Sequence, residues 1–99
     1  MTWEDIRYRD FYDVPRIFVF ESAGKTYLAE CRYSEGVDDY ERAYTLFEMP
    51  PLSQLALDAS WENLSAQAIR KLGEIAVTKV VFDKSKRRQV NTDVFTGML

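Results

Sequence analysis

The chain contains one cysteine, Cys31, and no histidine, which removes most side-chain chemistry at once. A serine or cysteine nucleophile is normally activated by a neighbouring histidine, and no such pair can form within this sequence. Zinc sites built from cysteine and histidine are excluded for the same reason. We therefore expect a protein that is not an enzyme and binds no cofactor.

Cys31 itself lies in an alternating segment, on the same side as Tyr27 and Ala29. A thiol becomes reactive beside positive charge, but Arg32 is expected to point to the opposite side of the strand. The pattern predicts a buried cysteine that packs as a small hydrophobic side chain. A single cysteine also argues against a disulfide-stabilised secreted domain and indicates a reducing compartment.

Acidic and aromatic side chains gather between residues 33 and 41 and form the first candidate binding site. Tyrosine brings large contact area with little rotamer entropy, so it often anchors protein interfaces. Negative charge beside it would suit a basic protein partner, whereas a plain solvent-facing loop is the alternative. The candidate partner-binding residues are Tyr33, Glu35, Asp38, Asp39, Tyr40 and Glu41.

The same segment holds the tightest cluster of carboxylates, Asp38, Asp39 and Glu41. Carboxylate oxygens are ligands for hard cations, but the segment lacks the spaced ligands and the sixth-position glycine of an EF-hand loop. We expect a solvated acidic loop here and no metal site.

Four cations within five residues form the second candidate, a site for phosphate or nucleic acid. Modules that bind nucleic acid usually place exposed aromatic rings beside such charge. Only Phe82 is near in sequence, and its place in a predicted strand indicates the core. Nucleic-acid binding is therefore disfavoured against a solvated turn. The four residues are Lys84, Lys86, Arg87 and Arg88.

A third hypothesis is an enzyme that uses Asp10, Tyr12 and Asp13 as general acid and base. It would require carboxylates with raised pKa values inside a cleft. Polar residues just before Pro15 more often mark a turn.

Charge is divided unevenly along the 99 residues, whose net charge is -3. Residues 1–64 carry a net charge of -7 and residues 65–99 a net charge of +4. Such polarity can steer a charged partner, or it can hold the two halves of the chain together. A hydrophobic content of 46% suits one globular domain over residues 1–99.

Periodicity predicts an α+β fold with elements in the order β-β-β-α-β and one main helix on one face of a small antiparallel sheet. Residues 16–21 and 26–33 are expected to form a hairpin. Residues 42–49 form the third predicted strand and residues 75–82 the fourth.

Residues 61–72 are the predicted main helix, around which the rest of the expected fold is organised. Ser60 can cap its first turn, and Gly73 stands where a left-handed residue often ends a helix. One face of this helix would seal the sheet. The residues of that face are Trp61, Leu64, Ser65, Ala68, Ile69 and Leu72.

Shorter elements are expected at three places. Residues 2–5 resemble a capping box and predict one helical turn. Residues 52–59 fit either a short strand or a helical turn capped by Ser53. Asn91 is expected to cap a final short helix.

Five segments are distinctive, namely 8–15 (YRDFYDVP), 60–64 (SWENL), 72–73 (LG), 80–83 (VVFD) and 87–88 (RR). Together they resemble a group of small uncharacterised bacterial proteins, over nearly the whole chain. The resemblance implies a stand-alone bacterial domain of unknown function and assigns no site residues.

No signal peptide or membrane helix is expected, because the N-terminus is charged at once and no apolar run approaches the ~18 residues that span a bilayer. The sequence thus favours a cytoplasmic, non-catalytic protein-interaction or regulatory (immunity-like) domain. A phosphate or nucleic-acid binder is the alternative. A homodimer is compatible with either, since an exposed edge strand can be covered by a second copy.

Overall fold

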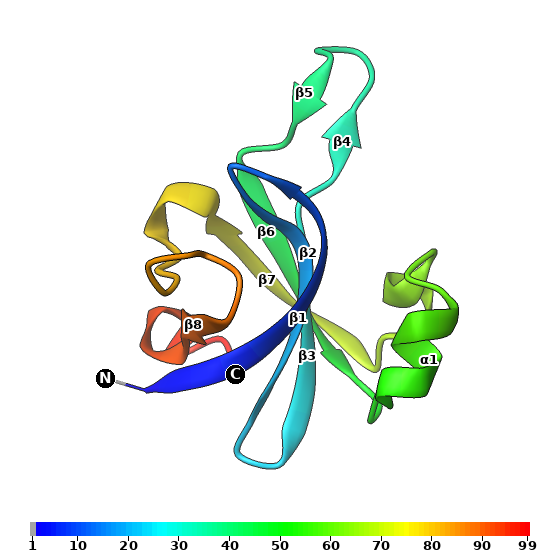
Figure 1. Ribbon diagram of the computed structural model, residues 1–99, viewed down its shortest axis with the longest axis vertical. Helices are drawn as coiled ribbons and strands as arrows, with labels where there is room; N and C mark the ends of the chain where they lie inside the picture. The colour runs from blue at the N-terminus through cyan, green and yellow to red at the C-terminus, as the bar shows by residue number, and fades with distance from the viewer. Residues whose placement is uncertain (1) are drawn as a thin grey trace.

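The computed structural model describes residues 2–99, and its main element is a six-stranded antiparallel sheet (Figure 1). Its strand order is β7-β6-β3-β2-β1-β8, while β4 and β5 form a separate two-stranded ribbon. The strands are β1 (Trp3–Tyr12), β2 (Val14–Ser22), β3 (Lys25–Glu30), β4 (Tyr33–Ser34), β5 (Asp39–Tyr40), β6 (Ala43–Met49), β7 (Arg70–Ala76) and β8 (Gln89–Asn91). The helical elements are α1 (Gln54–Ala59) and the 3-10 turns η1 (Leu64–Gln67), η2 (Val77–Lys79) and η3 (Thr92–Phe95).

Both faces of the sheet are covered (Figure 1). Side chains alternate along each strand, so the central strands supply a separate apolar cluster to each face. The face covered by η2, β8 and η3, here called the C-terminal face, centres on Phe18, Phe20, Tyr44, Leu46 and Phe95. The face covered by α1 and η1, here called the α1 face, centres on Val19, Leu28, Phe47, Leu57 and Leu64.

The predicted hairpin of residues 16–21 and 26–33 is confirmed as β2 and β3, except that β3 ends at Glu30 and Tyr33 belongs to β4. The third predicted strand is confirmed as β6. The continuous apolar run of β2 is buried on both faces, which its composition indicated. The turn places Ala23 at φ 50° and Gly24 at φ 78°. Two successive positive φ angles match the right-handed twist of the flanking strands, so they fix the pairing of Ser22 with Lys25.

The predicted α+β fold with a main helix over residues 61–72 is wrong. Only one α-helix is present in residues 2–99, the six-residue α1, and residues 70–76 instead form strand β7. Asn63 has a left-handed φ of 57° and Ala68 is extended, so the segment is helical only as the single turn η1. Residues 70–76 pair with the edge of β6 and pack Leu72 and Ile75 against the C-terminal face. This tertiary pairing and packing overrides the local helical preference of the segment.

The apolar residues of the expected helix therefore separate onto both sides of the sheet. Leu64 and Trp61 pack on the α1 face, and Leu72 packs on the C-terminal face. Ile69 is 61% exposed. Gly73 does not end a helix: it lies within β7 at φ 146°, beside the register shift at Leu46 and Phe47. It marks a β-bulge, the other common role of a glycine in an alternating segment.

Two further predictions are wrong and one ambiguity is settled. The helical turn at residues 2–5 falls in β1, because Trp3, Glu4 and Asp5 pair with β8. The strand expected at 75–82 ends at Ala76, and of its remainder only Phe82 forms a bridge, with Val90. Residues 52–59 contain α1, not a strand.

The predicted cap at Asn91 is confirmed, and of the two alternatives left open for residues 52–59 the helical turn capped by Ser53 forms. The Ser53 hydroxyl accepts a hydrogen bond from the Ala56 amide at 3.0 Å, and the Asn91 side chain accepts one from the Asp93 amide at 2.9 Å. Both are local side-chain contacts, which a sequence pattern can show without knowledge of the tertiary fold.

A substitution at Tyr44 tests whether the C-terminal face is packed as the structure shows. Its buried hydroxyl donates to the Pro15 carbonyl at 2.6 Å. Replacing Tyr44 with phenylalanine leaves that carbonyl without its donor and should cost about 1–3 kcal/mol at neutral pH. The free energy of unfolding in urea measures the loss.

The pH dependence of this difference checks the burial of the phenol. Burial raises the pKa of Tyr44 above its ordinary value of 10.0. The neutral phenol therefore stabilises the fold fully below pH 10, and this contribution is lost as the pH rises through the folded-state pKa. We expect the stability gap between wild type and Tyr44→Phe to shrink above pH 10; a constant gap would contradict the burial.

Candidate protein-interaction surface

The six predicted partner-binding residues all lie in residues 33–41, which form the ribbon of β4 and β5 with its connecting loop and Glu41. This segment is called the acidic ribbon below. It projects from one end of the sheet, away from both covered faces (Figure 1). Tyr33 pairs with Tyr40 and Ser34 with Asp39 across the two strands. The residues are therefore displayed on a protrusion.

Side-chain contacts order the acidic ribbon from within. The rings of Tyr33 and Tyr40 meet edge to face at 5.3 Å. The Tyr33 hydroxyl donates to the Asp38 carboxylate, and this hydrogen bond raises the pKa of the phenol. An Asp39 carboxylate oxygen accepts from the Tyr40 amide at 2.7 Å. Internal contacts of this kind lower the entropy that the ribbon would lose on binding.

The acidic ribbon keeps its negative charge and an apolar tip exposed. Glu35, Asp38, Asp39 and Glu41 are all exposed. No ion pair between residues within 2–99 includes any of these four carboxylates. Val37, in the connecting loop, is 72% exposed. The surface thus combines unpaired negative charge with apolar and aromatic contact area.

A cluster of rings around Arg16 anchors the acidic ribbon to the sheet. The Arg16 guanidinium lies 4.7 Å from the centre of the Tyr40 ring and 5.8 Å from that of Tyr12. Its Nε donates to the Tyr12 carbonyl at 2.9 Å. Below the rings, the Glu41 amide donates to the Arg32 carbonyl at 2.7 Å. Such cation–π contacts hold the base of the ribbon while leaving Tyr12 59% exposed.

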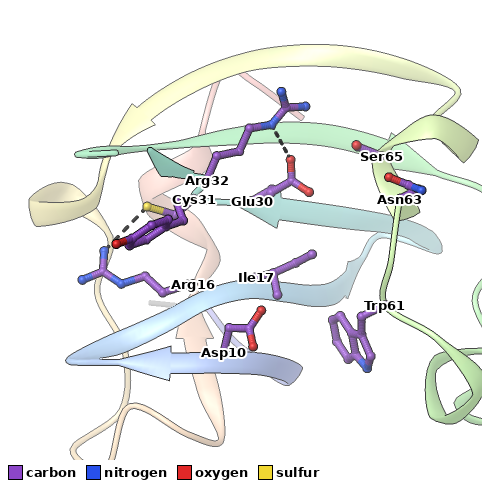
Figure 2. Close-up of a pocket in the computed structure, with 10 residues that line it drawn as sticks. Asp10, Arg16, Ile17, Glu30, Cys31, Arg32, Trp61, Asn63 and Ser65 are labelled. Atoms are coloured by element: carbon purple, nitrogen blue, oxygen red, sulfur yellow. Dashed lines mark hydrogen bonds and ion pairs between the residues drawn. The ribbon is translucent and has the colours of Figure 1, made fainter. Parts of the chain in front are cut away.

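A groove of about 490 Å³ lies at the base of the acidic ribbon (Figure 2). Arg16 and Arg32 face it together with Asp10 and Glu30, so the charges of its walls balance. The Arg32 Nε donates to Glu30 at 2.8 Å, and the Trp61 ring stands on the opposite side of the groove. The lining residues are Asp10, Arg16, Ile17, Glu30, Cys31, Arg32, Tyr33, Trp61, Asn63 and Ser65.

Cys31 has the predicted packing role, because its side chain is buried in the cluster of the C-terminal face. Its thiol donates to the Glu41 carbonyl at 2.7 Å. The Arg16 guanidinium approaches the sulfur to 3.6 Å, a contact with a neighbouring strand that the sequence did not indicate. Burial nevertheless raises the pKa of the Cys31 thiol, which disfavours the reactive thiolate.

The basic residues 84–88 lie in a turn that Asp83 organises. One carboxylate oxygen of Asp83 accepts from the Arg88 and Gln89 amides, and the other accepts from Ser85. These hydrogen bonds hold the pKa of Asp83 well below its usual range, the Ser85 hydroxyl contributing most. Two of the four cations, Lys86 and Arg87, contact the β1–β2 hairpin.

Arg87 and Lys86 are engaged within the fold. The Arg87 guanidinium lies 4.2 Å from the centre of the Phe11 ring, and the Lys86 ammonium donates to the Asp13 carbonyl at 3.4 Å. An aromatic ring, Phe11, thus lies beside the basic turn. The sequence did not indicate this contact, because Phe11 is far from residues 84–88 along the chain. Because Arg87 covers it, the ring is already occupied by a cation.

The three residues of the acid–base hypothesis are not arranged around one cleft. Asp10 lines the groove, Tyr12 belongs to the Arg16 cluster, and the Asp13 carbonyl accepts from Lys86. Asp13 joins β1 to β2 with a left-handed φ of 65°, which suits a residue that turns the chain. Asp10 has a φ of 58° but lies within β1. Within residues 2–99, no group of three or more histidine, cysteine, aspartate or glutamate side chains could hold a metal ion.

No sequence pattern indicated that Tyr12, Arg16 and Trp61 lie at the base of the acidic ribbon. Tyr12 meets Tyr40 across 28 positions of chain, and their rings lie 6.0 Å apart. Contacts of this kind depend on the pairing of β1 with β2 and on the path of the chain after β3. No local pattern could have shown them.

Comparisons with known protein families, with curated proteins and with solved structures found no match. The resemblance to small bacterial proteins therefore stays a prediction. In the part of the chain that the structure describes, no helix has the length and apolar character required to cross a membrane.

Proposed function

We propose that this chain is a non-catalytic protein-interaction domain of regulatory or immunity-like type, and that the acidic ribbon docks onto a basic surface of a protein partner. One observation carries the proposal: exposed carboxylates without an ion-pair partner in residues 2–99 stand on a projecting, aromatic ribbon. Unpaired charge on a protrusion speeds the encounter with an opposite surface, and tyrosines supply contact area once docked.

The distribution of ion pairs supports a role for this charge outside the chain. Of the three ion pairs between residues in the range 2–99, only Arg70–Glu48 joins the acidic half to the basic half. Within residues 2–99, a single close ion pair therefore joins the two halves. A reducing bacterial cytosol suits the buried free thiol of Cys31 and completes the proposal.

Binding of phosphate or nucleic acid by residues 84–88 is the second candidate. The exposure of Lys84 and Arg88 favours it, whereas the engagement of Lys86 and Arg87 within the fold weakens it. It requires binding that weakens steeply with salt and is lost in Lys86→Glu/Arg87→Glu. Undetectable or salt-independent binding at low salt would reject it.

Charge reversal on the acidic ribbon tests the first candidate. We expect tagged wild-type protein to capture a stoichiometric partner from bacterial lysate at low salt. Asp38→Lys/Asp39→Lys should lose that partner, because two repulsive charges replace two attractive ones and slow association.

The matched control is Asp58→Lys/Glu62→Lys, which makes the same change of net charge at exposed positions near α1. This variant should retain the partner. Equal loss in both variants would attribute capture to net charge alone, and capture of no stoichiometric protein by wild type would count against the interaction itself.

A further inference from the structure

The two outer strands of the sheet differ in whether their outer edges are covered by other parts of the chain. β8 is covered by the chain that precedes it: the Asn91 amide donates to the Val81 carbonyl at 2.8 Å, and the Asp83 amide to the Gln89 carbonyl at 3.0 Å. β7 is the other end of the strand order, and within residues 2–99 no strand pairs with its outer side. An open edge of this length is a template for a further strand.

The charges along β7 are of both signs. Lys71 and Glu74 are exposed, and no ion pair within residues 2–99 includes either one. A row of lysines would repel a second copy and protect the edge. Charges of opposite sign can instead complement each other when the same strand meets itself in the antiparallel direction.

The β-bulge in β7 determines whether Lys71 and Glu74 point to the same face of the sheet, as a contact between two copies would require. Lys71 pairs with Phe47, and Glu74 with Thr45, in the register with β6. Phe47 packs on the α1 face, and Thr45 shares that face because Leu46 between them points to the C-terminal face. Although they are three residues apart, Lys71 and Glu74 therefore point to the same face, since the extra residue at Leu72 shifts the alternation.

We propose that two copies of the chain pair antiparallel through β7 and form one continuous sheet. The two-fold axis passes between Leu72 and Gly73, perpendicular to the sheet, so each face of one copy continues into the same face of the other. Lys71 then lies opposite Glu74 of the second copy, and the symmetry repeats this contact. The bulges of the two copies meet at the axis, so residues that lie opposite each other on either side of it point to the same face of the sheet.

The same register covers an exposed apolar side chain. Ile69, which precedes β7, lies opposite Ala76 of the second copy. Its exposed fraction of 61% is large for isoleucine beside a strand. The occupant of the edge is thus a second copy of this chain, identified by charge complementarity and by the register, and the inference does not depend on the acidic ribbon.

Analytical ultracentrifugation over a range of concentrations tests the proposal. Wild type should show a reversible dimer that weakens as salt is added. Glu74→Lys and Lys71→Glu should each weaken dimerisation by about tenfold, because two attractive cross-strand pairs become repulsive. The double variant Lys71→Glu/Glu74→Lys restores both pairs with reversed sign and should return the dimer.

Two controls separate this result from other causes. The urea midpoint of each variant reports whether the fold is intact, and Asp38→Lys/Asp39→Lys should dimerise as wild type does because it changes only the acidic ribbon. A wild-type protein that stays monomeric at every concentration would overturn the proposal. So would a double variant that remains as weak as the single ones.

Discussion

Replacing Phe18 with alanine is expected to remove about 3–5 kcal/mol of stability, because a large buried ring is lost and a cavity is left. Phe18 is fully buried on the C-terminal face. Its ring meets those of Tyr44, Phe82 and Phe20 at 5.3, 5.4 and 5.9 Å. The total stability of a domain of this size is about 5–15 kcal/mol, so the variant should be largely unfolded at modest urea concentrations.

Phe18→Leu is the matched control, because it keeps an apolar side chain in the same place and should lose clearly less. The free energy of unfolding in urea, measured for both variants, provides the comparison. A Phe18→Ala protein within about 1 kcal/mol of wild type would contradict the central position of this ring, since such a small loss is typical of partly exposed sites.

Replacing Tyr33 with alanine is expected to weaken partner binding by about thirtyfold, the loss of roughly 2 kcal/mol typical of an anchoring tyrosine. Tyr33 is 49% exposed and stands on the acidic ribbon beside the groove. Little stability should be lost, because Tyr33 is half exposed: its ring packs against Tyr40 and its hydroxyl donates to Asp38, both on the ribbon. Titration calorimetry with the captured partner measures the affinity.

The Tyr33→Phe variant shows which part of the side chain matters. It keeps the ring and removes the hydroxyl that donates to Asp38, so we expect it to lose no more than a few-fold in affinity. If Tyr33→Ala binds as tightly as wild type while its urea midpoint is unchanged, the ring contributes no contact area to the complex.

Elements with strong local signals could be predicted from the sequence. The hairpin of β2 and β3 and the cap at Asn91 depend on residues close together in the sequence, and both form as expected. At residues 52–59 the sequence left a strand and a helical turn open, and the turn capped by Ser53 forms. The buried role of Cys31 follows from strand alternation in the same way.

The segment 61–72 could not be predicted, because two structures compete for the same residues. Its spacing of apolar residues fits a helix, but pairing with the edge of β6 instead packs Leu72 and Ile75 against the C-terminal face. Gly73 was compatible with both roles, a helix stop or a bulge. Tertiary pairing decided between them, and tertiary pairing leaves no local signature.

Only part of the candidate site could be predicted from the sequence. The acidic ribbon is contiguous in sequence, so its charge and tyrosines could be identified directly. The groove and the Arg16 cluster combine residues from β1, β2 and the segment after α1, which only the fold brings together.

The most direct test of the docking role is photo-crosslinking from the ribbon itself. A photoreactive phenylalanine analogue would replace Val37 in one protein and Leu55 of α1, which is 80% exposed, in another. Both are exposed apolar positions, but only Val37 lies on the acidic ribbon. We expect irradiation in bacterial lysate to join the Val37 probe to one protein through a basic surface and to leave the Leu55 probe without that product. The absence of any product from Val37, or the same products from both positions, would contradict the account.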